Sequence, residues 1–262
     1  MNSKSQTEIF QILESRADFY NQPSFIVDDP ISIPHIFSRK EDVEIAGFLA
    51  ATLSWGQRKS ILVACKKLMG LMKYQPYEFI LNADKIELDK LNGFVYRTFQ
   101  YDDLLWFIEV LKFIYLERGG LEFVFYEGFE KSRDVWNSIL NLNYEFQKIP
   151  HLKRSEKHLA NPEKGSACKR LNMFLRWMVR KDEKGVDFGI WHKIPMSELL
   201  LPLDVHVANI SRKFGLLSRK QNDRKAVDEI MKILRTYCPE DPVKYDYALF
   251  SLGCVEKYNQ KT

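Results

Sequence analysis

The chain has 262 residues, of which 45% are hydrophobic and 28% charged, as in an ordinary globular protein. Its 12 glycines and 10 prolines are too few for an all-β protein rich in tight turns, and no apolar run approaches a membrane span. The N-terminus lacks an apolar signal-peptide core, and the four cysteines have no metal-like spacing. We therefore expect a cytoplasmic protein with reduced thiols, no metal or cofactor and no membrane contact.

Positive charge is concentrated in one part of the sequence. Between Lys148 and Lys225 there are 18 Lys and Arg against 8 Asp and Glu, a local charge of +10. The formal net charge is +4, so the remainder carries 4 − 10 = −6. This asymmetry is typical of a face that meets phosphates, although a solvated helical surface would have the same composition.

The first part of the chain predicts three helices. Residues 5–20 place apolar side chains at helical spacing, which indicates an amphipathic first helix, and the three prolines of residues 21–34 indicate a loop. Residues 41–72 predict two helices with a break at Gly56, the first of them almost entirely apolar and therefore buried.

The middle of the chain continues the helical pattern. The clearest helix begins with Asp102 or Asp103 as its N-cap and ends with Gly119 at the C′ position. Residues 121–148 predict one or two further helices, and residues 150–164 form a polar, basic connection.

Two helices are predicted near the end of the chain. Residues 222–238 form the first, which Pro239 stops. The second has Asp241 as its N-cap, Pro242 at its first position and Gly253 as its C′ residue. No segment alternates like a strand, so the sequence predicts an all-α protein.

The segment GSACKRLNMFLRWMVR contains the first group of candidate functional residues. Gly165, Ser166 and Ala167 lie between two helical segments, and such small residues let backbone N–H groups approach a phosphate. Lys169 follows at the start of a helix, where its amine is a candidate nucleophile. An ordinary turn followed by a surface lysine would explain the same residues.

The segment PLDVHVANISRKFGLL contains the second group. Asp204 precedes a helix that ends at Gly215, so it is a natural N-cap, and a rigidly held cap carboxylate is also suited to catalysis. His206 lies in the first turn, where it either points at a ligand or is simply packed or solvated. Arg212 and Lys213 are candidate phosphate contacts on the same helix.

These segments resemble the helix-hairpin-helix DNA glycosylases, the superfamily of endonuclease III. GSACKRLNMFL matches the family pattern GVGRKTANVVL at equal length, and PLDVHVANISRKFGLL is similar to (V/P)DTHVxRVxxRLGL. VEIAGFLAATLS and YDYALFSLG resemble an early buried helix and a late helix of the same fold, and all four pieces keep the family's order. More narrowly, the whole chain resembles a group of bacterial proteins of unassigned function in this superfamily.

The resemblance implies a fold and a reaction. Residues 1–262 would form a single all-α domain of two lobes, with the hairpin and catalytic segment at residues 160–217. Lys169 would attack the sugar carbon that bears the base, and Asp204 would stabilise the positive charge on the sugar and assist proton transfer. The turn from Gly165 to Ala167 would bind phosphate, with Arg170 as a further contact.

The implied enzyme is a DNA N-glycosylase with AP-lyase activity on a damaged or modified base. The amine of Lys169 must be neutral to attack, so we expect burial or nearby cations around it. The family's four-cysteine iron–sulphur pattern is absent, so no cluster is expected.

A second interpretation is a non-catalytic protein that keeps the glycosylase fold and binds DNA or RNA. The presence of both Lys169 and Asp204 favours the enzyme. Ala167, which stands where the family has its second hairpin glycine, favours the binding protein. In either case we expect a monomer whose partner is a nucleic acid.

Overall fold

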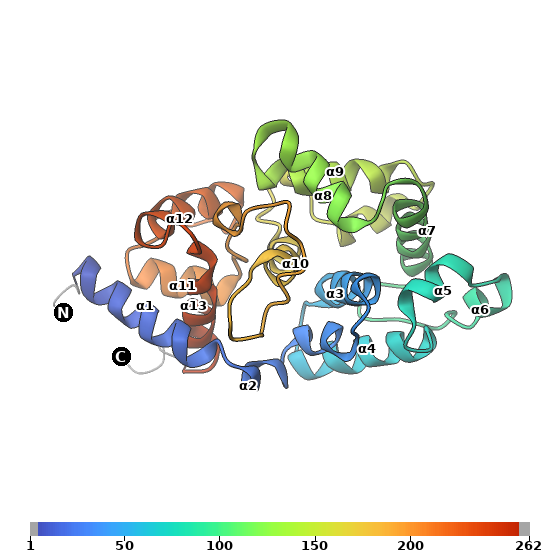
Figure 1. Ribbon diagram of the computed structural model, residues 1–262, viewed down its shortest axis with the longest axis horizontal. Helices are drawn as coiled ribbons and strands as arrows, with labels where there is room; N and C mark the ends of the chain where they lie inside the picture. Colours follow the sequence, from blue (N-terminus) through green and yellow to red (C-terminus); the bar gives the residue numbers. More distant parts are fainter. Residues whose placement is uncertain (1–4, 257–262) are drawn as a thin grey trace. The chain divides into compact units, whose positions relative to one another are not determined.

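Helices make up the regular structure of this protein, as a computed structural model shows for residues 5–256 (Figure 1). Within that range there are thirteen α-helices and six 3₁₀ turns, and the only β pairing is two isolated bridges. The prediction of an all-α protein is therefore confirmed. The chain divides into two units: unit 1 comprises the described residues up to Phe25, Pro162–Gly189 and Pro195 onward, and unit 2 comprises Ile26–Asn161 and Ile190–Ile194.

Unit 1 contains the candidate functional residues. In this unit α1 packs along α13, and α11 packs against α13 as well (Figure 1). Its helices are α1 (Gln6–Tyr20), α10 (Lys169–Val179), α11 (Val205–Lys213), α12 (Arg224–Tyr237) and α13 (Tyr245–Cys254), with the 3₁₀ turns η4 (Pro162–Lys164), η5 (Met196–Glu198) and η6 (Pro242–Lys244).

Unit 2 is formed almost entirely by one continuous stretch of chain. In this unit α8 packs against α9, and α3 packs against α4, α5, η1 and η2. The helices are α3 (Lys40–Leu53), α4 (Arg58–Leu71), α5 (Pro76–Asn82), α6 (Lys85–Asp89), α7 (Tyr101–Glu117), α8 (Leu121–Ser132) and α9 (Val135–Gln147), with η1 (Pro30–Ser32), η2 (Pro34–Ile36) and η3 (Lys153–His158). The short α2 (Pro23–Ile26) spans the boundary between the units.

The helices predicted from apolar spacing are present, and several of their ends are as predicted. Ser5 caps α1 in a capping box with Glu8. The break between α3 and α4 contains Gly56 at φ +103°, a conformation that favours glycine. Gly119, at φ +73°, follows the C-cap of α7. The predicted loop at residues 21–34 differs, because α2 and η1 lie within it.

Three predicted helix ends are wrong. The N-cap of α7 is Gln100, and Asp103 lies three residues into the helix, where its carboxylate accepts the Gln100 N–H at 2.8 Å. Asp241 and Pro242 begin the turn η6, so α13 starts only at Tyr245. Gly253 lies inside α13, at a position where the start of α11 comes close: a Cβ at this position would be 3.0 Å from Cβ and O of His206.

Candidate active site in unit 1

Lys169 and Asp204 are in contact although 35 residues separate them (204 − 169 = 35). Lys169 Nζ lies 3.9 Å from Asp204 Oδ2, within unit 1. The Lys169 side chain is 31% exposed and the Asp204 side chain 17% exposed, so a ligand can reach both. The starts of α10 and α11 therefore bring together the two residues for which the sequence predicts chemistry.

The carboxylate of Asp204 is fixed by the helix that it caps. Its Oδ1 accepts the N–H groups of His206 and Val207, both at 2.9 Å, which confirms the predicted N-cap. Since Oδ1 makes both capping bonds, Oδ2 is directed to Lys169. The α11 dipole favours the negative charge of this carboxylate. Capping and contact with Lys169 thus use different oxygens of one side chain.

The turn before α10 is held by its own backbone and by α12. Gly165, at φ +79°, donates its N–H to Pro162 O at 3.1 Å, and its carbonyl accepts the N–H of Arg224 at 3.0 Å. Ser166 Oγ accepts the N–H of Cys168 at 3.1 Å. The element that precedes Gly165 is the 3₁₀ turn η4, so among the described residues no α-helix leads directly into this turn. This differs from the two helical segments expected around the turn.

Two buried residues join the turn to α10. Ala167 is buried, and its carbonyl accepts the Asn172 side-chain N–H at 3.0 Å. Cys168 is the N-cap of α10 in a left-handed conformation at φ +47°. Burial raises the pKa of the Cys168 thiol to about 12, so it is uncharged at neutral pH. The turn is therefore preorganised, with Lys169 as the first residue after it.

Cationic side chains surround this turn. Arg170 and Arg224 both act electrostatically on the Cys168 thiol. Burial lowers the pKa of Arg170 to about 10, which still leaves it protonated at neutral pH. Lys164 is exposed on the turn itself. The predicted contact Arg170 thus lies beside the turn, and Lys164 and Arg224 add charges that the sequence reading did not single out.

Three other predicted residues lie on α11. His206 is exposed in the first turn, with its ring 6.5 Å from that of Phe250. Lys213 is exposed at the far end of the helix. Arg212 holds a loop: its guanidinium donates to the carbonyls of Arg219 at 2.9 Å and Lys220 at 2.8 Å. Arg212 lies eight residues beyond Asp204, roughly 12 Å along the helix axis, so it is distant from the Lys169–Asp204 pair.

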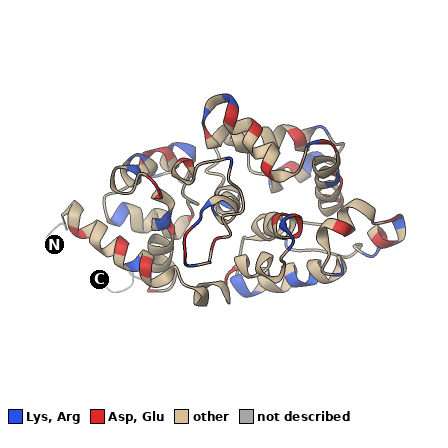
Figure 2. Ribbon diagram, in the orientation of Figure 1, with Lys and Arg blue, Asp and Glu red and all other residues tan. Residues whose placement is uncertain are grey.

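The basic stretch from Lys148 to Lys225 is not a single face. It is divided between the two units, and basic and acidic residues are interspersed along its elements (Figure 2). Arg176 and Arg180, which contribute to the local charge, are buried. Some of the positive charge in this stretch is therefore paired with carboxylates inside unit 1 and does not face a ligand.

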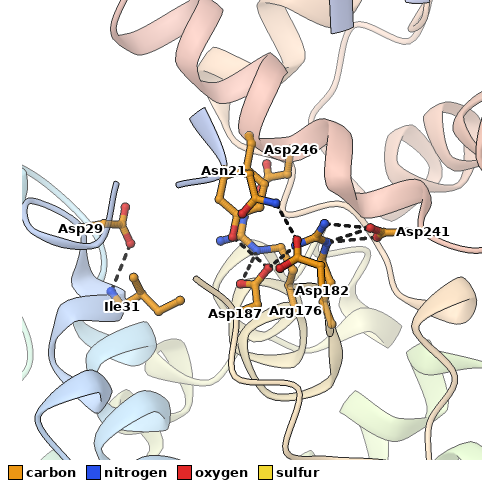
Figure 3. A network of polar contacts seen from close by, with 10 residues as sticks. Asn21, Asp29, Ile31, Arg176, Asp182, Asp187, Asp241 and Asp246 are labelled. Carbon is orange, nitrogen blue, oxygen red and sulfur yellow. Dashed lines mark hydrogen bonds and ion pairs between the residues drawn. The ribbon is translucent and has the colours of Figure 1, made fainter. Parts of the chain in front are cut away.

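The sequence reading missed a buried ionic network centred on these two arginines. Arg176 donates from Nε to Asp187 at 3.2 Å and from Nη1 to Asp246, and both carboxylates point toward it (Figure 3). Arg180 pairs with Asp187 at 3.0 Å and with Asp241 at 2.8 Å. Arginines inside an otherwise apolar helical segment were the available signal, because a buried guanidinium requires carboxylate partners.

Asp246 connects this network with the candidate active site. The pKa of the Asp246 carboxyl is raised to about 6, mainly by burial; the charges of Arg176 and Lys169 oppose this rise, whereas that of Asp204 adds to it. Asp246 is thus electrostatically linked to both members of the Lys169–Asp204 pair.

The described part of the chain contains neither a membrane-spanning helix nor a cluster of metal-binding side chains. Residues 5–256 contain no helix with the length and apolarity to cross a membrane. In the same range no group of three or more His, Cys, Asp or Glu is placed to hold a metal ion.

Comparison with known proteins identifies one family. Its model, described as Protein of unknown function (DUF2400), matches residues 29–255, which include the Lys169–Asp204 pair and the buried network. No curated protein and no solved structure matches the chain. Because the match covers most of the sequence, the chain belongs to the family described as Protein of unknown function (DUF2400).

Proposed function

We propose that unit 1 is a DNA N-glycosylase with AP-lyase activity, in which Lys169 is the nucleophile and Asp204 assists. The observation that carries this proposal is the 3.9 Å contact between Lys169 Nζ and Asp204 Oδ2 at the starts of two helices. A lysine amine beside a rigid carboxylate is the arrangement needed for Schiff-base chemistry on a sugar.

The reaction follows from the roles of the two side chains. The Lys169 nitrogen forms a bond to the sugar carbon that bears the base, and the bond from that carbon to the base breaks with its electrons leaving on the base. Asp204 stabilises the positive charge on the sugar and accepts the proton that the amine loses. Asp204 returns that proton to the ring oxygen as the sugar ring opens to give the Schiff base, and water protonates the released base. Water then removes a proton from the carbon next to the Schiff base, and the electrons of that C–H bond expel the 3′ phosphate from the following carbon.

The turn before α10 suits a phosphate backbone. Lys164, Arg170 and Arg224 give it positive charge, and the Gly165 backbone has open space around it, with nothing within 4 Å of a Cβ built there. A base in a duplex is inaccessible to Lys169, so the target nucleotide must be extruded into unit 1.

One observation favours a second candidate, a nucleic-acid-binding protein without catalysis. Ala167 is buried beneath the turn, and only a 3₁₀ turn precedes it, so the turn differs from the hairpin pattern on which the enzyme assignment depends. In this case the cations around the turn would bind phosphates, and Lys169 would form only an ion pair.

Borohydride trapping tests the proposal. The protein is incubated with a duplex that contains one abasic site, and borohydride reduces any Schiff base to a stable covalent adduct. We expect an adduct with the wild-type protein and none with Lys169→Ala. Lys184→Ala is the matched control, because it removes an exposed lysine of unit 1 that lies outside the turn and outside the Lys169–Asp204 pair, and it should still form the adduct.

The outcomes separate the two candidates. An adduct that persists in Lys169→Ala would remove Lys169 as the nucleophile. No adduct with any of the proteins, together with intact duplex binding, would exclude the lyase; duplexes with damaged bases would then be screened for base release to distinguish a monofunctional glycosylase from a binding protein.

A further inference from the structure

Arg212 holds the loop of residues 218–223, which leads from α11 into α12. Its Nε donates to Arg219 O at 2.9 Å, and its Nη2 donates to Lys220 O at 2.8 Å and to Asn222 Oδ1 at 2.5 Å. A guanidinium presents its donors in a rigid planar fork, so these three bonds fix both carbonyls toward Arg212. Arg212, which the sequence suggested as a phosphate contact, is therefore bonded to the loop itself.

The other side of this loop presents backbone donors. In a planar trans peptide the carbonyl and the N–H point in opposite directions, and the described residues contain no cis peptide bond. Because the carbonyls of Arg219 and Lys220 accept from Arg212, the N–H groups of Lys220 and Gln221 point away from it. Within residues 5–256 neither N–H has a hydrogen-bond partner, and both residues are exposed. Successive N–H groups that point the same way are suited to an anion.

The charged side chains of the loop favour an anion as well. The two nearest carboxylates are bonded to the loop: Asp223 accepts from Arg219 Nε at 2.7 Å, and Glu229 accepts the Ser218 N–H at 2.6 Å. Asp223 is also the N-cap of α12. Lys220 is exposed at the same point of the chain as the two N–H groups. An ammonium and two backbone donors therefore lie together on the solvent side of the loop.

This loop lies beside the turn that precedes α10. Ser166 and Asp223 form an isolated antiparallel bridge, and Arg224 donates its N–H to Gly165 O at 3.0 Å. Lys220 precedes Asp223 by three residues, so their Cα atoms are at most about 11 Å apart. Phosphates of one DNA strand follow one another about every 3.4 Å along the helix axis. The turn and the loop are thus close enough to contact phosphates of one strand a few nucleotides apart.

We propose that the N–H groups of Lys220 and Gln221, together with the Lys220 ammonium, form a phosphate-binding site for a nucleic-acid backbone. Arg212 is the positioning residue that builds this site by holding the carbonyls of the same peptide units. The choice of a nucleic acid as the source of the phosphate rests on the proposed function. A free phosphate ion offers the same oxygens, and the experiments below separate the two sources.

Salt-dependent binding of a duplex with one abasic site, measured by fluorescence anisotropy, tests the site. Lys220→Gln should reduce the log–log salt dependence by about 0.9, the value for one lost phosphate contact. Arg212→Lys keeps the positive charge, but one ammonium cannot reproduce the three bonds of the guanidinium, so duplex affinity should fall about five-fold. Wild-type affinity in Arg212→Lys would overturn the positioning role, because it would show that only the charge matters.

Lys232→Gln is the matched control. Lys232 is an exposed lysine of α12 outside the loop, so its loss removes the same charge and should leave the salt dependence unchanged. Equal reductions in Lys220→Gln and Lys232→Gln would overturn the site, because they would reflect net charge alone. An unchanged salt dependence in Lys220→Gln would overturn it as well.

The amide signals of the wild-type protein give a second readout that needs no substitution. In ¹⁵N-labelled protein the amide protons of Lys220 and Gln221 should move downfield when the duplex is added, because each N–H gains a charged acceptor. Inorganic phosphate at the same concentration of phosphate groups should move them less. Equal movement with both would overturn the nucleic-acid assignment in favour of free phosphate, and no movement with either would overturn the site.

Failure of this site and failure of the proposed function are distinguishable. If borohydride trapping fails while Lys220→Gln lowers the salt dependence, the lyase reaction is removed and the phosphate site is kept. If trapping succeeds while Lys220→Gln and Arg212→Lys bind the duplex like the wild type, the phosphate site is removed and the reaction is kept.

Discussion

At the scale of single residues, Asp204 has two roles that a pair of substitutions can separate. Asn caps helices as well as Asp, so Asp204→Asn should leave the free energy of unfolding within a few tenths of a kcal/mol but remove the charge beside Lys169. Asp204→Ala loses both the helix cap and the charge, and should lower the free energy of unfolding by about 1 kcal/mol. Urea unfolding measures the change in stability, and borohydride trapping measures how the loss of the charge affects Schiff-base formation. Full trapping by Asp204→Asn would show that the carboxylate charge is dispensable.

Asp246 gives a prediction about pH. Folding raises the pKa of its carboxyl from 3.8 to about 6, mainly by burial. Between these values the folded chain binds more protons than the unfolded chain, so this group makes the protein less stable as pH rises from about 4 to 6. Asp246→Asn lacks the effect.

Urea unfolding at pH 4 and pH 7 checks this prediction. The stability of Asp246→Asn relative to the wild type should increase between these pH values by up to about 3 kcal/mol. A stability difference that is the same at both pH values would contradict it.

At the scale of elements, the crossing of α11 and α13 depends on Gly253. A Cβ there would be 3.0 Å from the His206 backbone oxygen, so Gly253→Val should force the helices apart and cost about 2 kcal/mol. Because α11 begins at Asp204, trapping should weaken too. Gly70→Val, in α4, is the matched control. A Cβ built at Gly70 has nothing within 4 Å, so the free energy of unfolding of this variant should change by less than about 0.5 kcal/mol. Equal losses in both variants would show that the close approach is unimportant.

The elements were predictable because helical periodicity is a local property. The break at Gly56 and the cap at Asp204 depend on neighbouring residues, and the sequence contains them. Partners distant in sequence were not predictable: Arg176 and Asp246 are 70 residues apart, and Arg180 and Asp241 are 61 apart. For the same reason Asp241 looked like a cap, although its carboxylate accepts from Arg180.

At the scale of the whole molecule, each unit presents basic residues that could meet a nucleic acid. Lys164 and Arg224 lie near the turn in unit 1, whereas Lys66 and Lys67 are exposed on α4 in unit 2. If unit 1 binds the duplex, Lys164→Gln with Arg224→Gln should reduce the log–log salt dependence of binding by about 1.8, or 0.9 per lost phosphate contact.

The matched pair in unit 2 is the control for this measurement. Lys66→Gln with Lys67→Gln removes the same amount of charge and should leave the salt dependence unchanged. If the Lys66 and Lys67 variant reduced the salt dependence and the Lys164 and Arg224 variant did not, the binding surface would lie on α4 instead. A salt dependence that is flat in the wild type would argue against phosphate contacts altogether.

The two units also differ in when their chain becomes complete during translation. Unit 2 uses one nearly continuous stretch, whereas unit 1 needs α1 from the beginning and α13 from the end. Phe10 contacts Tyr245, which is 245 − 10 = 235 residues later. At roughly 5–20 residues per second, the apolar side of α1 waits about 10–50 s for this partner. A chain that ends before α13 would thus have unit 2 complete, whereas α1 would lack its Tyr245 contact and the buried Arg176 would lack Asp246.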